Sequence, residues 1–185
     1  MSKQSRVFIA FSISYPDKLR LFTLRHQLQV NQLNCNWVSL PKLHLTLSFL
    51  GSLSKSELES VVELVNELRL DLKEFQLNWR GVSAFPSKKR ARVLILKLGG
   101  QDIKKLNRLV ANLKTRLQKL EINFERKKFM PHITLGRFKA PVNLQKLKTG
   151  LQNGQEIWLK DLGVFESQLL KNGSKYRRIR QMKWW

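Results

Sequence analysis

The pattern His-apolar-Thr-Leu occurs twice in this chain, beginning at His44 and at His132, although the chain has three histidines in all. Both copies lie in runs that alternate apolar and polar residues, HLTLSFLG and HITLGRF, which is typical of strands. Residues two apart on a strand point to the same face, so His44 and Thr46 share one face and the leucines between them share the other. His132 and Thr134 repeat this arrangement. We therefore expect two strands that each turn one imidazole and one hydroxyl away from the core.

If the two strands came together, they would form a pocket with two imidazoles and two hydroxyls. Two histidines can divide the acid and base roles on a phosphodiester, one activating water and the other protonating the departing oxygen. The threonines can donate hydrogen bonds to the non-bridging phosphate oxygens. A single histidine on a strand is more often structural, but packing alone does not explain two copies of the pattern. His26, on a predicted helix without such a partner, is interpreted as structural or exposed.

Strands and helices alternate along the chain without a long linker. Strands are predicted over 6–13, 44–51, 75–85, 91–98, 132–138, 156–167 and 176–185, and helices over 16–30, 55–68 and 99–120. Ser54 and Glu57 have the spacing of a capping box. Leu19, Phe22 and Leu28 are expected to form the buried stripe of the helix over 16–30. This order predicts a single α+β domain over residues 1–185, with two similar halves that face each other.

Charge is the strongest signal in the composition. The chain has 35 Lys and Arg against 13 Asp and Glu, a net charge of +22. Such an excess favours a polyanionic partner, with nucleic acid ahead of an anionic membrane surface. The segment 171–185 is entirely without acidic residues and contains Lys171, Lys175, Arg177, Arg178, Arg180 and Lys183. This tail is a candidate to follow an RNA backbone. Two alternatives stay open: a folded strand whose arginines serve the structure, and a solvated basic surface without a partner.

Cys35 is the single cysteine, so the chain cannot form an intrachain disulfide, and with three histidines it has too few ligands for a zinc cluster. We expect neither metal nor cofactor, and a reducing, cytoplasmic location. The N-terminal run RVFIAFSI alternates like a strand and precedes no clear cleavage site. No apolar stretch has the length of a membrane span. The expected protein is an unexported monomer with no membrane contact.

Five segments, in order, resemble the two-histidine phosphoesterases, and within them the LigT-like RNA 2′,3′-cyclic phosphodiesterases. The resemblance covers nearly the whole chain. The segments are RVFIAFSI, LHLTLSFLG, AFPSKKRARVLILKL, FMPHITLGRF and VFESQLLKNGSKY.

This resemblance implies a two-lobed, pseudo-symmetric fold in which antiparallel sheets line a central cleft and helices cover the outer faces. His44, Thr46, His132 and Thr134 would lie at the floor of the cleft. The implied reaction hydrolyses a 2′,3′-cyclic phosphate at an RNA end to a 2′-phosphomonoester. His44 would be the acid toward the leaving 3′-oxygen and His132 the base for water. Reversal with a 5′-hydroxyl in place of water would give 2′-5′ RNA ligation.

Arg137 matches an arginine that follows the second motif in this family, where a guanidinium would bind phosphate. Simple alternation, however, places Arg137 on the core side together with Ile133 and Leu135. We therefore expect a bulge near Gly136, or the end of the strand, to turn Arg137 toward the cleft. A surface salt bridge is the alternative role.

The segment FPSKKRAR is predicted to be a basic hairpin tip beside an aromatic residue. Phe85 is a candidate to stack on a base, and Lys88, Lys89 and Arg90 are candidates to contact the phosphate chain. A solvated tip without a ligand is the alternative for each of these residues.

Two other functions stay open beside the enzyme. The first is a module that binds cyclic-phosphate RNA ends without turnover, although such a binder would usually have lost a motif histidine or threonine. The second is a basic structural protein of nucleic acids, which has no need of paired imidazoles. The charge exceeds what is normal for the resembling family, and this favours a longer RNA over small cyclic nucleotides as substrate.

Overall fold

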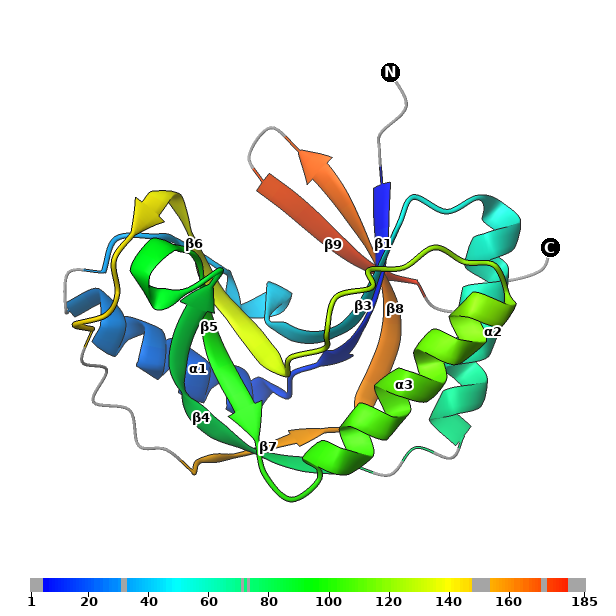
Figure 1. Ribbon diagram of the computed structural model, residues 1–185, viewed down its shortest axis with the longest axis horizontal. Coiled ribbons are helices and arrows are strands. Elements are labelled where there is room, and N and C mark those ends of the chain that lie inside the picture. Colours follow the sequence, from blue (N-terminus) through cyan, green and yellow to red (C-terminus); the bar gives the residue numbers. More distant parts are fainter. Residues whose placement is uncertain are drawn as a thin grey trace.

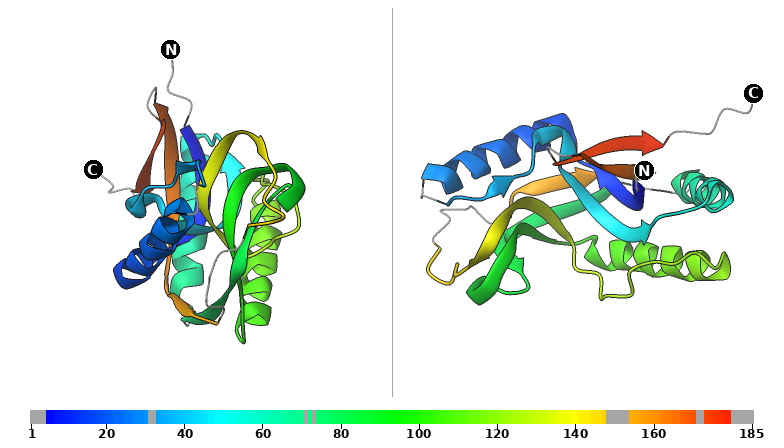
Figure 2. Two further views of the ribbon diagram at one scale, coloured as in Figure 1. Left: turned by 90° about the vertical axis from the view of Figure 1, so that its left-hand side faces the viewer. Right: turned by 90° about the horizontal axis from the view of Figure 1, so that it is seen from above.

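The computed structural model of the protein describes residues 5–30, 33–70, 72, 74–147, 154–170 and 173–179. Within these residues, nine strands form two antiparallel sheets, and three α-helices lie toward the outside of the molecule (Figures 1 and 2). The predicted α+β architecture of two facing sheets with peripheral helices is confirmed.

A four-stranded sheet carries the first motif. Its spatial order is β3, β1, β8, β9, with antiparallel pairing throughout. Its strands are β1 (Ser5–Ser12), β3 (His44–Gly51), β8 (Asp161–Leu170) and β9 (Gly173–Ile179). The first motif therefore lies on the strand at one end of this order.

A five-stranded sheet carries the second motif. Its spatial order is β2, β6, β5, β4, β7, and its pairs are again antiparallel. Its strands are β2 (Asn36–Trp37), β4 (Phe75–Phe85), β5 (Ala91–Gly99), β6 (His132–Val142) and β7 (Glu156–Leu159). Two short 3-10 helices, η1 (Leu40–Lys42) and η2 (Lys88–Arg90), precede β3 and β5.

Helices α2 (Lys55–Leu70) and α3 (Ile103–Lys119) form where the sequence predicts them. The capping box of α2 is present: the Glu57 N–H donates to Ser54 Oγ at 3.3 Å, and the Ser54 N–H donates to the Glu57 carboxylate at 2.6 Å. Leu106, Val110, Leu113 and Leu117 form the buried stripe of α3.

Helix α1 (Tyr15–Val30) also forms, and its predicted buried stripe is right for Leu28 and wrong for Leu19 and Phe22. Leu21, Leu24 and Leu28 are buried, whereas Leu19 and Phe22 are each 44% exposed. Apolar residues occur on two faces of this helix, and the contact with the rest of the fold selects the face that contains Leu21 and Leu24.

The single strand predicted over 156–167 is two strands in different sheets. β7 pairs with β4 in the five-stranded sheet, and β8 pairs with β1 in the four-stranded sheet. The break falls at Lys160, where the spacing of buried residues changes parity from Ile157 and Leu159 to Leu162 and Val164. β8 and β9 form the C-terminal hairpin, but β9 begins at Gly173, three residues before the predicted strand, and residues 180–185 of that predicted strand lie outside the described residues.

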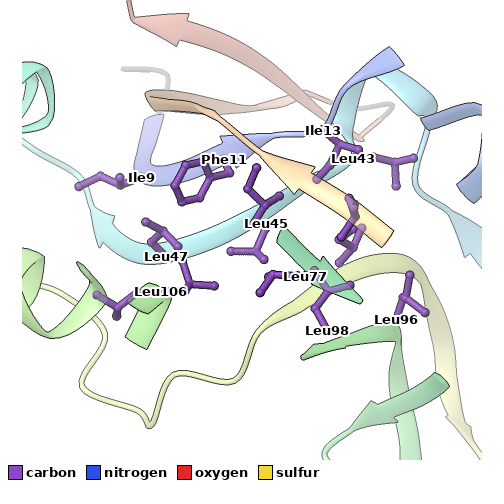
Figure 3. Packing of buried hydrophobic residues seen from close by; sticks show 14 of the residues in the cluster. Ile9, Phe11, Ile13, Leu43, Leu45, Leu47, Leu77, Leu96, Leu98 and Leu106 are labelled. Carbon is purple, nitrogen blue, oxygen red and sulfur yellow. The ribbon is translucent and has the colours of Figure 1, made fainter. Parts of the chain in front are cut away.

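Side chains from both sheets meet in one hydrophobic core (Figure 3). Leu45 and Leu47 of the first motif lie in this core beside Leu77 of β4 and Leu106 of α3. The apolar residues of the motif strands thus fix those strands to the core, and the alternate side chains are left to face away from it.

Candidate active site

Both motif strands contain a β-bulge at the same place. In β3, Thr46 pairs with Ala10 and Ser48 pairs with the adjacent Ile9, so Leu47 is an extra residue. Leu47 and Ser48 are both buried, and the alternation of faces is reversed beyond them.

In β6, Thr134 pairs with Ile95 and Gly136 pairs with the adjacent Leu94, so Leu135 is the extra residue. The sequence of buried and accessible positions from His132 onward is the same as the sequence from His44. The two motif strands therefore repeat one backbone device.

The bulges turn the residue five positions after each histidine to the same side as the histidine. In β6 this residue is Arg137, which is exposed and lines the cavity described below. The bulge near Gly136 that was expected to turn Arg137 toward the cleft is therefore confirmed. In β3 the equivalent residue is Phe49, which is 46% exposed and lines the same cavity.

Each motif histidine is held by the carbonyl of the residue two positions earlier. His44 Nδ1 lies 2.6 Å from the Lys42 carbonyl oxygen, and His132 Nδ1 lies 2.7 Å from the Met130 carbonyl oxygen. A carbonyl oxygen only accepts, so Nδ1 must carry a proton in both rings. In the neutral imidazole Nε2 is then the unprotonated nitrogen, as a general base requires.

Aromatic side chains fix the orientation of the histidine rings. The His44 ring lies 4.9 Å from the Phe8 ring and meets Tyr176 edge-on at 5.4 Å between centroids. The His132 ring meets Phe85 edge-on at 4.9 Å. Contacts of this kind restrict rotation of the imidazoles, which keeps their nitrogens directed as the backbone hydrogen bonds require.

The four motif side chains line one cavity of about 490 Å³ between the two sheets. β3 supplies His44 and Thr46, and β6 supplies His132 and Thr134. The two imidazoles and the two hydroxyls therefore lie in one cavity, as the sequence analysis expected.

Burial lowers the pKa of both His44 and His132 below the ordinary value of 6.5. The backbone hydrogen bond opposes this shift in each ring, and the positive charge of Arg137 adds to it in both. His132 also lowers the pKa of His44, so the two imidazoles sense each other. The unliganded site therefore favours neutral imidazoles near pH 7, and a bound anion would favour protonation.

Comparison with known proteins assigns the chain to a family. The family model described as LigT like Phosphoesterase matches residues 13–95 and 98–176, which include both motifs. This chain belongs to that family.

Relatives of this LigT-like phosphoesterase carry a consistent name. The Thermotoga maritima protein named RNA 2′,3′-cyclic phosphodiesterase is 28% identical over 174 residues, covering 93% of this chain and 91% of the relative. A protein of the same name from Archaeoglobus fulgidus is 30% identical over 142 residues, covering 75% of this chain and 77% of the relative.

Solved structures share the fold. The crystal structure of the Thermus thermophilus protein TT0787 is 26% identical, with a TM-score of 0.78 and coverage of 95% of both chains. The apo structure of Escherichia coli LigT is 20% identical, with a TM-score of 0.71, covering 97% of this chain and 96% of that one. The two-lobed fold expected from the resemblance is thereby confirmed.

The predicted RNA contacts on the central hairpin separate into two groups. Phe85 lines the cavity beside His132. Lys88, Lys89 and Arg90 form η2 at the exposed tip of the hairpin, and they are not among the residues that line this cavity. His26 is exposed on α1, as expected.

The sequence analysis did not identify several cavity residues. Beside Phe49 and Tyr176 these are Val38, Lys42, Leu47, Ser48, Val93, Lys114, Glu125, Lys127, Lys128, Phe129 and Met130. The sequence does contain a signal for Phe49, because Phe49 follows His44 by five positions, as Arg137 follows His132. Leu47 and Ser48 lie on β3 itself, where simple alternation does not turn both toward one cavity. Val93 and Tyr176 lie on the strands β5 and β9, and the rest come from η1, α3 and loops, so their place beside the motifs depends on the tertiary fold.

The described part of the basic tail is a strand with paired charges. Both nitrogens of the Arg178 guanidinium terminus lie 2.5 Å from the Asp161 carboxylate, and Arg177 bonds Glu166 at 2.9 Å. These ion pairs link β8 to β9, as in a folded strand whose arginines serve the structure; contact of the tail with RNA stays a prediction. Lys171, Arg180 and Lys183 lie outside the described residues.

Three further features concern cofactors, thiol chemistry and membranes. Within the described ranges, three or more His, Cys, Asp or Glu side chains nowhere gather as a metal site would require. Burial raises the pKa of the Cys35 thiol to about 11. Across those same ranges the helices are all too short or too polar to traverse a bilayer.

Proposed function

We propose that this LigT-like phosphoesterase hydrolyses the 2′,3′-cyclic phosphate at an RNA end to a 2′-phosphomonoester. The observation that carries the proposal is the pair of imidazoles in one cavity, each with Nδ1 bound to a carbonyl and Nε2 left for chemistry. The relatives named RNA 2′,3′-cyclic phosphodiesterase support the choice of substrate.

The proposed reaction is a displacement at phosphorus that needs one base and one acid. The water proton passes to Nε2 of His132 as the water oxygen bonds to phosphorus. The bond from phosphorus to the 3′-oxygen breaks, and that oxygen takes the proton from Nε2 of His44. Exchange with solvent returns both rings to their starting states, and the phosphate stays on the 2′-oxygen.

The charge that develops on the non-bridging oxygens requires donors beside the histidines. Thr46 and Thr134 share the faces of His44 and His132 and line the same cavity, so their hydroxyls are proposed to donate to these oxygens. Arg137, turned inward by the bulge of β6, is proposed to add a charged hydrogen bond. These three donors lie on the two motif strands, Thr46 on β3 and Thr134 and Arg137 on β6.

Recognition of a nucleotide is assigned to the aromatic wall of the cavity. Phe49 on β3 and Phe85 on β4 belong to different sheets and both line the cavity, and Phe85 contacts the His132 ring. An exposed aromatic ring next to a phosphate site is suited to stacking on a base without selecting its sequence.

Metal independence is part of the proposal, because two imidazoles can supply both proton transfers. RNA ending in a 2′,3′-cyclic phosphate is incubated with the protein in excess chelator, and the product end is identified. A 2′-phosphate formed at an undiminished rate is expected. Activity that is lost in chelator and restored by a divalent ion would contradict this mechanism, and a 3′-phosphate product would contradict the assignment of the leaving oxygen.

The alternative is a module that binds cyclic-phosphate RNA ends without turnover. Retention of all four motif side chains in one cavity favours the enzyme, since binding alone does not need paired proton-transfer groups. Tight binding with an unchanged RNA end, measured in the same experiment, would select the module. Ligation of a 5′-hydroxyl RNA would be tested by supplying that end at high concentration.

We propose a monomer as the active species, since one chain can supply both imidazoles and both hydroxyls of the site. We propose a cytoplasmic location, since a chain with a single cysteine suits a reducing compartment. Light scattering on the purified protein tests the oligomeric state, and cell fractionation tests the location.

A further inference from the structure

The cavity has more positive charge than one cyclic phosphate can balance. Its lining contains five cationic side chains against one carboxylate, Glu125; the cations are Lys42, Lys114, Lys127, Lys128 and Arg137. A terminal cyclic phosphodiester carries a single negative charge. If Arg137 binds that phosphate, the lysines are left for another anion.

The loop between α3 and β6 carries part of this charge and is fixed beside the first motif. The Glu125 N–H donates to the Phe49 carbonyl at 2.9 Å, and Lys114 Nζ donates to the Lys127 carbonyl at 3.0 Å. The Lys127 ammonium pairs with the Glu125 carboxylate at 2.9 Å. Lys114 and Lys127 are thus engaged in holding the loop against the cavity.

Two lysines of the lining have no such role. Among the described residues, neither the Lys42 nor the Lys128 ammonium has a carboxylate within salt-bridge distance. Lys42 ends η1 and Lys128 lies in the α3–β6 loop, so they belong to separate segments that border one cavity. Ammonium groups placed in this way can bind phosphate as point charges.

We infer that the cavity holds a second phosphate of the RNA, the phosphodiester on the 5′ side of the cyclic end, and that Lys128 and Lys42 bind it. This rests on the proposed function. In a nucleotide whose 2′ and 3′ oxygens both carry the cyclic phosphate, the chain can continue only from the 5′ oxygen. The substrate class is therefore an oligoribonucleotide with at least two phosphates, and a cyclic mononucleotide lacks half of the recognised charge.

Three substrates separate the contribution of the phosphate from that of the added nucleoside. They are uridine 2′,3′-cyclic phosphate, the same compound with a 5′-phosphate, and the dinucleotide that ends in uridine 2′,3′-cyclic phosphate. The wild-type kcat/KM should rise at least about tenfold when the 5′-phosphate is added, as expected for a charge-assisted contact. The dinucleotide should retain this gain.

Lys128→Gln and Lys42→Gln test the assigned residues, and Lys104→Gln is the matched control. Lys104 is exposed on α3 and does not line the cavity. Each cavity variant should lose roughly threefold to tenfold in kcat/KM on the two substrates with a 5′-phosphate group and retain the rate on uridine 2′,3′-cyclic phosphate. The salt dependence of kcat/KM on the dinucleotide should become shallower, because one screened charge contact is removed. Lys104→Gln should change neither quantity.

Equal wild-type kcat/KM on all three substrates would overturn the inference and leave the proposed function intact. The same conclusion would follow if the cavity variants lost equal activity on all three, or if they behaved like Lys104→Gln. Failure of the wild-type protein to hydrolyse any of the three would instead overturn the proposed function, and the inference with it.

Discussion

The two motif strands share one pattern of buried and accessible residues over eight positions and differ in the side chain that follows the bulge and lines the cavity. β3 and β6 share the histidine, the threonine and the bulge, but five positions after the histidine β3 has Phe49 and β6 has Arg137. The shared pattern gives each strand one imidazole for the proposed phosphorus. The presence of Phe49 on β3 and Arg137 on β6 makes the two walls of the cavity different. One wall is suited to a base and the other to a phosphate.

The largest effect should come from removing the motif histidine of either strand. His44→Ala and His132→Ala are each expected to lower kcat by at least about a hundredfold, because each deletes one proton-transfer group. Since the pair acts as a unit, the double variant should lose far less than the product of the two single losses. Steady-state kinetics on a cyclic-phosphate RNA, with circular dichroism to check folding, measures this. A variant with near-normal rates would return its histidine to a structural role.

A smaller effect should come from the arginine that distinguishes β6. Arg137→Gln is expected to cost roughly tenfold to a hundredfold in kcat/KM, because a charge-assisted hydrogen bond to phosphate is lost. Arg137→Lys keeps the charge and loses the bidentate geometry, so it is the matched control.

Arg137→Gln should also shift the pH dependence of kcat/KM in a defined direction. The reaction needs one neutral and one protonated imidazole, and both pKa values lie below 6.5, so the bell-shaped profile of kcat/KM should peak on the acid side of pH 6.5. Arg137 lowers both pKa values, so Arg137→Gln should move the whole profile to higher pH. Arg137→Lys should leave it in place. A flat wild-type profile between pH 5 and 9 is incompatible with paired histidines.

The aromatic that distinguishes β3 should have a more modest effect. Phe49→Leu keeps an apolar side chain and removes the ring, so kcat/KM on an RNA substrate should fall about five- to tenfold, the lower part of the range for base stacking. The loss should appear mainly in KM, because the ring does not contact the reacting phosphorus. A cyclic phosphate substrate without a base should be unaffected, and an equal loss on that substrate would contradict the assignment.

A change at the residue just before Arg137 or Phe49 should affect stability and leave the chemistry of the cavity in place. A Cβ at Gly136 would lie 2.5 Å from Cys35 Sγ, so Gly136→Ala should destabilise the fold by about 1–3 kcal/mol. The equivalent residue in β3 is Ser48, whose buried Oγ has no hydrogen-bond partner in the described structure, so Ser48→Ala should be nearly neutral. Denaturant unfolding of both variants measures the difference. Adding Cys35→Ala to Gly136→Ala should restore part of the lost stability, and no restoration would refute the proposed clash.

The sequence predicted the motif strands because alternation with period two is a local property. It predicted the bulge in β6 because Arg137 would otherwise be a buried charge. It was silent on the same bulge in β3, since Phe49 is apolar and creates no conflict on either face. The buried face of α1 and the crossing at Lys160 depend on contacts between distant segments. The pairing of Arg178 with Asp161 likewise depends on the register of β8 with β9.

The central claim is that two equivalent strands perform opposite proton transfers, and a substrate with sulfur in place of the 3′-oxygen tests it most directly. A thiolate leaves without protonation, so the acid becomes dispensable and the base does not. On this substrate His44→Ala should approach the wild-type rate, whereas His132→Ala should stay at least about a hundredfold below it. Equal rescue of both variants, or rescue of neither, would contradict the division of roles between β3 and β6.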